Sequence, residues 1–427
     1  MSHVHRHQHV GFVPAPATSF NTDKPDTPVV VGRPGPAMQR GVAQARTAAA
    51  PQPVVPSGNG VIDPAAPNTP SQVMIATYNV ENLFDTVHDP KVDADDGEFL
   101  PGGRNHWTED KYKAKLDNIA RVIRSVNGGR GPDILGLEEI ENRKVLEDLV
   151  ARLPDLGYQI IHFDSKDARG IDNAILARSN YQLVGQPSLH QVESNDPHDP
   201  VWQGKTTRGI LEATFEVMGV PVTIFVNHWP SQGSGSAAVP RRMQAAQKLR
   251  ELVSAHNAKD GKGEIVAVGD FNINPSDKSF GPEGLQATGS VAKALSGAAL
   301  VYETDADTFQ RLAPHVPTEV FEDLTRYDEL RNGELGRKIG TEYFSRDREW
   351  SILDMIFVNK ALVPGDKVGF AVVPGSTVRV ANQFTAHSDG TPRRTFENDG
   401  HESASDIGYS DHFMKVTRLE KVEPKTA

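Results

Sequence analysis

The sequence predicts an α/β protein in which buried strands alternate with amphipathic helices. From Gln72 onward, short apolar runs alternate with stretches whose apolar residues recur at helical spacing. Of the 427 residues, 37% are hydrophobic and 24% are charged, a balance that suits a soluble protein with a large core. The chain has no run of about 18 apolar residues, so no membrane-spanning helix is expected.

Seven apolar runs are typical of buried strands. In chain order they are Val73–Tyr78, Asp133–Leu137, Asn173–Ala177, Val222–Val226, Ile265–Val268, Asp354–Val358 and Phe413–Val416. Because these runs are short and are separated by longer amphipathic or polar stretches, we expect a sheet-based core with helices outside it.

Three helices are expected between the strands. Tyr112–Asn127 places its apolar residues on one face, and Val145–Leu153 is closed by Pro154. A third helix begins at Pro240, whose fixed φ suits a first helical turn, and runs to about His256. The chain contains neither GxGxxG nor GxxxxGK[ST], so no βαβ nucleotide-binding unit is predicted.

The first 72 residues differ from the rest of the chain. They hold 12 of the 30 prolines and lack apolar periodicity, so we expect a disordered tail, followed by one domain over 73–420 and a short C-terminal tail over 421–427. Alternating histidines near the start favour either a weak metal-binding arm or a solvated tail. They are His3, His5, His7 and His9.

Location and assembly are less constrained. No apolar segment follows Met1, so a standard secretory signal peptide is not expected, and a secreted and a cytoplasmic protein both stay open. We expect a monomer. The absence of cysteine excludes disulfides, cysteine metal sites and a cysteine nucleophile. Three polar connections, 185–208, 276–349 and 375–410, exceed ordinary loop lengths and are candidates for determining specificity.

Polar residues gather where the predicted strands begin or end. They are Asn79, Glu138, Glu139, His228, Asp270, Asn272, Asp354, Asp411 and His412. One such terminus alone carries little information, because Asp, Asn and His often cap turns. Together these termini supply what a hard divalent cation and two proton-transfer groups require, provided that the strand ends converge.

The motifs TYNVEN, LGLEEIEN, GIDNAILARS, VNHWPSQ, VGDFNINP, LDMIFV and SDH resemble those of the endonuclease/exonuclease/phosphatase superfamily. The texture is similar to a bacterial nuclease-like group with NVENLFD near the start and NHWPS in the middle. The resemblance runs from about Val73 to Lys415. It implies a DNase I-like fold, a four-layer α/β sandwich of two mixed sheets packed face to face with helices outside.

The resemblance implies a metal-binding set. Glu139 matches the metal-binding acid of the family, Asn79 matches the Asn that contacts metal or phosphate, and Asp411 matches a metal-side acid. Glu138 stands where the family usually has Gln, and is either a partner of the ligands or solvent-facing. The implied ion is Mg²⁺ or Mn²⁺. A structural Ca²⁺ ion at the acidic stretch from Asp89 to Glu98 is a further interpretation, and a solvated loop is its alternative.

The resemblance also implies catalytic roles. Asp270 orients the nucleophile or a second metal, and Asn272 binds a phosphate oxygen. His228 hydrogen-bonds phosphate and is a candidate to protonate the leaving oxygen. His412 is the general base or phosphate-binding histidine, and Asp354 orients it.

Several further residues carry weaker expectations. Arg178 and Arg208 are candidate phosphate contacts, and Asp172 is a loose match for a residue that holds His228 in one tautomer. Trp107 and Trp229 either stack on substrate or pack under loops.

The leading hypothesis is a metal-dependent phosphodiesterase, a nuclease that hydrolyses DNA or RNA. The alternatives are a phosphatase or phospholipase C-type hydrolase acting on inositol phosphates or sphingomyelin, and a catalytically degenerate binding protein of the same fold. The net charge of -11 argues against attraction of nucleic acid by the whole surface, so any polyanion would be bound through local basic groups or metal ions.

Overall fold

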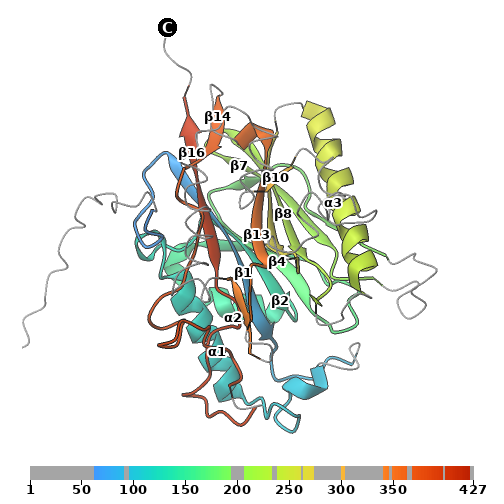
Figure 1. The fold of residues 1–427 in the computed structure, drawn as a ribbon, viewed down its shortest axis with the longest axis vertical. Coiled ribbons are helices and arrows are strands. Elements are labelled where there is room, and N and C mark those ends of the chain that lie inside the picture. The colour runs from blue at the N-terminus through green and yellow to red at the C-terminus, as the bar shows by residue number, and fades with distance from the viewer. Residues whose placement is uncertain are drawn as a thin grey trace, which may run out of the picture. The chain divides into compact units, whose positions relative to one another are not determined.

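The computed structural model describes residues 62–90, 96–193, 206–232, 238–260, 263–273, 300–302, 340–345, 349–362, 368–397 and 400–423. All of them lie in the compact unit Val54–Ala427. Within these ranges, two seven-stranded sheets and three α-helices form the body of the fold (Figure 1). No helix in the described part of the chain is long and apolar enough to cross a membrane.

The first sheet is built around the parallel pair β1 and β2. Its order is β14 (Gly369–Val372), β16 (Lys415–Val422), β1 (Gln72–Leu83), β2 (Ile134–Ile140), β4 (Asp172–Arg178) and β3 (Tyr158–His162), with β15 (Val378–Arg379) also pairing with β16. Strands β16 and β4 run antiparallel to β1 and β2, so the sheet is mixed. Strand β16 continues two residues beyond the predicted domain end at residue 420.

The second sheet is built around the parallel pair β8 and β9. Its order is β10 (Leu300–Tyr302), β13 (Asp354–Asn359), β9 (Glu264–Asp270), β8 (Val220–His228), β7 (Ile210–Val217) and β5 (Gln182–Leu183), with β6 (Ser188–His190) also pairing with β7. A separate hairpin joins β11 (Glu342–Phe344) to β12 (Glu349–Ser351). All seven predicted runs overlap observed strands, and the last strand starts at Lys415, two residues later than predicted.

The three predicted helices are present with shifted ends. Helix α1 (Glu109–Ile123) begins earlier than predicted because Thr108 caps it, its side chain accepting a hydrogen bond from the N–H of Lys111. Helix α2 (Arg143–Val150) is capped by Asn142 in the same way, and α3 spans Val239–Asp260. Short 3-10 turns occur at Asp96–Phe99, Asn127–Gly129, Pro154–Leu156 and Lys360–Leu362.

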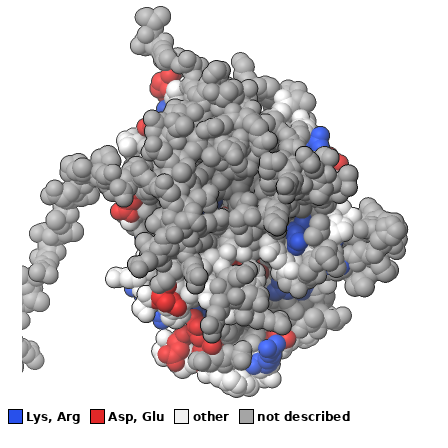
Figure 2. Space-filling model, in the orientation of Figure 1, with Lys and Arg blue, Asp and Glu red and all other residues white. Residues whose placement is uncertain are grey.

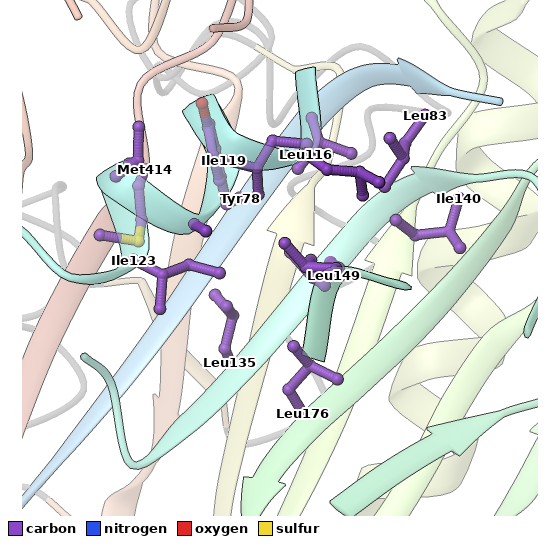
Figure 3. Packing of buried hydrophobic residues seen from close by; sticks show 14 of the residues in the cluster. Tyr78, Leu83, Leu116, Ile119, Ile123, Leu135, Ile140, Leu149, Leu176 and Met414 are labelled. Carbon is purple, nitrogen blue, oxygen red and sulfur yellow. The ribbon is translucent and has the colours of Figure 1, made fainter. Parts of the chain in front are cut away.

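The packing makes four layers. Leu116, Ile119 and Ile123 of α1 and Leu149 of α2 pack on the outer face of the first sheet, against residues that include Leu135 (Figure 3). Helix α3 covers the outer face of the second sheet (Figure 1). The inner faces of the two sheets meet in an apolar layer that joins β1, β2 and β4 to β7, β8, β9 and β13. The predicted four-layer α/β sandwich is therefore confirmed.

Gly136 lies where the two sheets are in close contact. A Cβ atom on Gly136 would lie 2.9 Å from Cγ2 of Val268 and 3.1 Å from Cγ2 of Val226. Both distances are tighter than ordinary packing allows. The missing side chain therefore lets β2 approach β8 and β9 a few residues before all three strands end.

Residues 62–72 belong to the folded body, although the sequence analysis assigns them to the tail. The guanidinium of Arg418 on β16 donates hydrogen bonds to the carbonyl oxygens of Asp63 and Ala66. Asn68 donates to a carboxylate oxygen of Asp133 at 2.7 Å. Side chains of the folded domain hold this segment by hydrogen bonds to its backbone. The segment is therefore ordered although its sequence shows no apolar pattern. The rest of the predicted tail lies outside the described residues.

Candidate active site

The predicted site residues converge at one edge of the sandwich because the strands that carry them end or begin there. In the first sheet, Asn79 of β1 pairs with Glu138 of β2. In the second sheet, Asp270 of β9 lies between His228 of β8 and Asp354 of β13. The site thus has two halves, one contributed by each sheet.

Irregular backbone shapes the half contributed by the first sheet. The pairing of β1 with β2 shifts register between Asn79 and Leu83, and the pairing of β2 with β4 shifts between Glu138 and Ile140. Glu139 adopts the left-handed region with φ 64°. Bulges of this kind redirect side chains next to active sites. Here the irregularity leaves Glu138 and Glu139, adjacent in sequence, in different environments.

Glu139 faces the second sheet. Its Oε2 accepts a hydrogen bond from the N–H of Asn82 at 2.8 Å, and its Oε1 lies 3.8 Å from Nε2 of His228. The side-chain amide of Asn79 donates to Oε1 of Glu139 at 3.4 Å and to Oδ2 of Asp270 at 3.2 Å. Asn79 therefore links the two halves of the site.

Glu138 is fully buried. Its Oε1 accepts a hydrogen bond from the hydroxyl of Thr77 at 2.7 Å, while its Oε2 has no hydrogen-bond partner among the described residues. Burial raises the pKa of Glu138 well above its usual range. Because a protonated carboxyl is neutral and has nearly the shape of an amide, Glu138 can occupy the place of the family's Gln. It is not solvent-facing.

His412 and Asp354 form the tightest pair of the site. Nδ1 of His412 lies 2.7 Å from Oδ2 of Asp354, which is fully buried. This contact fixes the ring so that Nε2 faces the carboxylates of Asp270, Glu342 and Asp411 at 3.8 to 4.0 Å. The orienting role expected for Asp354 agrees with this geometry.

The surroundings shift the pKa values of the two histidines in opposite directions. Burial lowers the pKa of His228 well below its usual value, and the guanidinium groups of Arg208 and Arg169 lower it further. Burial also disfavours the charged form of His412, but the carboxylates of Asp354 and Glu342 outweigh it and raise the pKa of His412 well above its usual value. The geometry thus favours a neutral His228 and a cationic His412 around one site.

Asp270 lies between these rings. Its Oδ2 is 3.7 Å from Nε2 of His228 and 4.0 Å from Nε2 of His412, and its Oδ1 accepts a hydrogen bond from the N–H of Asn272. Burial raises the pKa of Asp270 to about 7. A carboxylate with a pKa near neutrality, surrounded by hydrogen-bond donors, has the properties of a general base.

Asn272 follows β9 in the left-handed conformation, with φ 51°. Its amide donates to the carbonyl oxygen of Trp229 at 2.9 Å, and its Oδ1 accepts from the N–H of Gln232. Asn272 therefore ties the segment after β8 to the segment after β9. Its expected phosphate contact stays a prediction.

The residues that could hold a divalent cation are more numerous than predicted. Asp411, Glu342 and His412 each place a ligand atom within 4.8 Å of the others. Glu342 is 8% exposed and its Oε2 has no partner among the described residues, while burial raises the pKa of Glu342 to about 9. Buried carboxylates left without donors fit a site built for a cation. The sequence analysis missed Glu342, because it comes from a three-residue strand in a polar stretch.

Two other residues lie beside the site: Glu81, which the sequence marks only as a polar residue after the first strand, and Arg394, which was not predicted. Glu81 is buried behind Asn79, and its backbone N–H donates to Oδ1 of that residue. Arg394, from the connection 375–410, lies 3.4 Å from Oε1 of Glu81 and 3.5 Å from Oδ2 of Asp411. No strand-end pattern marks Arg394, so only its position in a long connection could have drawn attention to it.

One predicted residue lies away from the site, and another has a different partner from the one expected. Arg178 ends β4, which runs antiparallel to β2, so it lies at the opposite edge of the sheet and contacts Asp133. Asp172 bonds to His162 at 2.9 Å instead of to His228. Arg208 is buried and lies 3.5 Å from Asp167, close enough to His228 to lower its pKa.

The remaining sequence candidates are simpler to place. Trp107 and Trp229 are fully buried, which favours packing over substrate stacking. Of the acidic stretch considered for Ca²⁺, Asp93 and Asp95 lie outside the described residues.

The sequence model of the Endonuclease/Exonuclease/phosphatase family matches residues 74–304, more than half of the chain. No curated protein matches the sequence.

Several solved structures share a partial likeness with the chain. A family protein from Bacteroides thetaiotaomicron is 16% identical, with 83% of this chain and 100% of that chain covered and a TM-score of 0.45. The human Nocturnin catalytic domain with bound sulfate is 15% identical, with 82% and 95% covered and a TM-score of 0.42. A mannosyl-6-phosphatase from Bacteroides thetaiotaomicron is 16% identical, with 81% and 99% covered and a TM-score of 0.43.

The narrower bacterial group suggested by the motifs stays a prediction. The fold and the match over residues 74–304 show that the chain belongs to the endonuclease/exonuclease/phosphatase family of phosphoester hydrolases.

Proposed function

We propose that the protein is a metal-dependent phosphodiesterase that cleaves nucleic acid, DNA in preference to RNA. The observation that carries the proposal is the convergence of Glu139, His228, Asp270 and the His412–Asp354 pair at one edge of the sandwich. A degenerate binding protein would have no reason to retain every one of these groups in mutually oriented positions. Their retention therefore favours turnover.

The carboxylates fit a hard divalent cation. Asp411 and Glu342, whose ligand atoms lie within 4.8 Å of each other, would hold Mg²⁺ or Mn²⁺ through oxygen ligands, and Glu139 would add a further carboxylate as the resemblance to the family implies. When bound, such an ion supplies positive charge to the non-bridging phosphate oxygens. Burial raises the pKa values of Glu342 and Asp270, and a bound cation would favour the charged forms of both.

Three side chains carry out the proton transfer and the binding of phosphate. Asp270 accepts the proton of the attacking water, because its pKa of about 7 lets it exchange a proton near neutral pH. His412 donates a hydrogen bond from Nε2 to a phosphate oxygen as a cation, since Asp354 supports its charge. Neutral His228 contributes a ring N–H to the phosphate or to the leaving oxygen.

A nucleic-acid substrate would be bound locally. Figure 2 shows basic and acidic side chains in small groups on the face it displays, several of them next to one another, among the residues that it colours. Basic groups near the site include Arg208, Arg169 and Arg394. A chain with net charge -11 needs such local contacts to bind a polyanion. Inositol phosphates and sphingomyelin are the alternative substrates that the assay must exclude.

The test is a hydrolysis screen with purified protein. Supercoiled DNA, RNA, sphingomyelin and inositol phosphates are each incubated with Mg²⁺, Mn²⁺ or Ca²⁺, with EDTA controls. We expect cleavage of DNA that EDTA abolishes. Cleavage of only the lipid or the inositol phosphate would refute the substrate assignment, and metal-independent cleavage would refute the mechanism.

Two variants test the shared site. His228→Ala and His412→Ala should each lower kcat by about 100-fold or more, and the double variant should lose less than the product of the two, because groups that act on one phosphate are non-additive. Circular dichroism controls for folding. A His412→Ala enzyme with normal turnover would contradict the mechanism.

A further inference from the structure

We infer that Arg394 binds a phosphate that flanks the scissile one, so that the connection 375–410 selects polynucleotides over isolated phosphodiesters. The inference rests on the proposed function and names the contact that would distinguish its substrate class. It is drawn from the position of the guanidinium, from the way its backbone is held and from the net charge of the chain.

The guanidinium lies at the rim of the site. Its Nη2 is 3.5 Å from Oδ2 of Asp411, whose other oxygen is 3.9 Å from Nε2 of His412. One carboxylate therefore separates Arg394 from the ring expected to bind the scissile phosphate. The side chain of Arg394 is 36% exposed, whereas that of His412 is 5% exposed. Arg394 is thus placed outward from the reacting centre, where a neighbouring phosphate of a strand would lie.

Hydrogen bonds on its buried side fix the position of Arg394. The N–H of Thr395 donates to Oε2 of Glu81 at 2.6 Å, and Oε1 of Glu81 contacts the guanidinium at 3.4 Å. Nζ of Lys115 donates to the hydroxyl of Thr395 and to the carbonyl oxygen of Tyr409. A residue with this support loses little conformational freedom when it binds a ligand.

Helix α1 holds this connection by hydrogen bonds at Thr395, at Gly400 and at the residues from Ile407 to Tyr409. One face of α1 carries polar side chains at positions 111, 115, 118 and 121, the spacing of a single helical stripe. Lys111 donates to the carbonyl oxygen of Gly400 at 2.8 Å, Asn118 donates to those of Ile407 and Gly408 at 2.8 Å, and Arg121 reaches the hydroxyl of Tyr409. Figure 1 shows the segment lying beside α1. The connection is therefore a prearranged part of the site.

Close backbone packing completes the support. The N–H of Tyr409 donates to the carbonyl oxygen of Arg393 at 2.7 Å. A Cβ atom on Gly408 would overlap the carbonyl oxygen of Arg394, so a glycine is required there. The backbone on both sides of Arg394 is held while its guanidinium stays partly open to solvent.

The chemistry of the side chain matches a phosphate ligand. A guanidinium offers a planar fork of donors to phosphate oxygens, and Nη2 of Arg394 already contacts an anionic group, the carboxylate of Asp411. Exchange of its contact with Asp411 for a phosphate oxygen would also free that carboxylate for a cation. Arg394 would thus gain a phosphate contact and release Asp411 when the substrate binds. Such a local contact matters in a chain whose net charge is -11.

The test pairs a protein variant with a substrate variant. Single-stranded oligothymidylate is compared with thymidine 5′-p-nitrophenyl phosphate, which has no flanking phosphate. Arg394→Ala should raise KM for the oligonucleotide by about 10-fold, change kcat little and reduce the salt dependence of binding by about one contact. The single-phosphate substrate should be affected much less.

A neutral methylphosphonate at one flanking position should raise the KM of the original enzyme to a similar degree, and Arg394→Ala should add nothing to that loss. Arg394→Lys, which keeps the charge, should recover part of the affinity. Arg104→Ala is the matched control, because the side chain of Arg104 is 69% exposed and forms a surface ion pair with Glu98 at 3.9 Å. Its KM should stay unchanged.

Two results would overturn the inference. In the first, kcat falls equally on both substrates, which would assign Arg394 a role in holding Asp411. In the second, the losses from Arg394→Ala and from the methylphosphonate multiply. Binding of labelled oligothymidylate in the His412→Ala background separates this inference from the proposed function, because it needs no turnover. Equal affinity with and without Arg394 in that background would also refute the inference.

Discussion

Replacing Asp354 with Asn tests how His412 works. The substitution keeps the shape of the side chain but removes the charge that lies 2.7 Å from Nδ1 of His412. A hydrogen bond to a charged group is worth about 1.5–3 kcal/mol, which corresponds to a roughly 10- to 100-fold loss of proton affinity at His412. The pKa of His412 should therefore fall, because the carboxylate of Asp354 is the largest of the influences that raise it.

The assay is the pH dependence of kcat/KM on a small phosphodiester at saturating Mg²⁺, supported by NMR titration of the His412 ring in metal-free protein. If His412 acts as a cation, activity requires its protonated form, so the basic limb of the profile should move to lower pH in Asp354→Asn. At neutral pH we expect a loss of about 10-fold, milder than that of His412→Ala. Asp155→Asn, at an exposed carboxylate, is the control.

The direction of the shift decides between two roles. A general base requires the neutral ring, so a lower pKa would then move the acidic limb of the profile instead. Movement of the acidic limb would refute the cationic role of His412. An unchanged titration of the ring would refute the coupling to Asp354 itself.

Three further predictions follow from the structure. Glu139→Gln should lower activity by about 100-fold or more. Glu138→Gln should have a mild effect, because it replaces a neutral buried carboxyl with a neutral amide. The reverse order of effects would show that the roles of the two positions are exchanged. A chain that starts at Ile62 should keep its kcat and its melting temperature. A chain that starts at Ser71 should keep its kcat but lose about 3 kcal/mol of stability, because it loses the hydrogen bonds that hold residues 62–70. Equal melting curves for the two chains would contradict this. Burial raises the pKa of Glu264 to about 7, so the folded protein holds more protons than the unfolded chain between about pH 4.5 and pH 7, and the free energy of unfolding falls as the pH rises through that range. Glu264→Gln should therefore raise stability by on the order of 2 kcal/mol at pH 8 but not at pH 4 in denaturant titrations, and an equal effect at both pH values would refute this.

Much of the fold could be predicted because its central strands are buried on both faces. Strands β1, β2, β8, β9 and β13 are continuous apolar runs, and such runs are readable without knowledge of their partners. Strand β7 was missed because polar residues such as Glu212, Thr214 and Glu216 alternate with its apolar ones. The short strands β5, β6, β11 and β12 carry too few residues to show a pattern.

The candidate site residues that could be predicted lie at the ends of strands that have a clear apolar pattern. The error at Arg178 has a physical cause: a sequence shows that a strand exists but not its direction, and β4 runs opposite to β2. The start of β4 is therefore at the site and its end is not. Glu342 and Arg394 were missed because tertiary contacts, not local pattern, bring them to His412 and Asp411.

The close packing at Gly136 influences the distance between the two halves of the site. Distances within each half of the site are set by backbone pairing, as between His228, Asp270 and Asp354. The separation of the halves depends instead on how closely the apolar layer lets the sheets approach, and Gly136 is a point of close approach in that layer. A larger residue there would widen the space between Glu139 and Asp270 while leaving each half intact. A core residue that contacts none of the site groups therefore influences the distance between them.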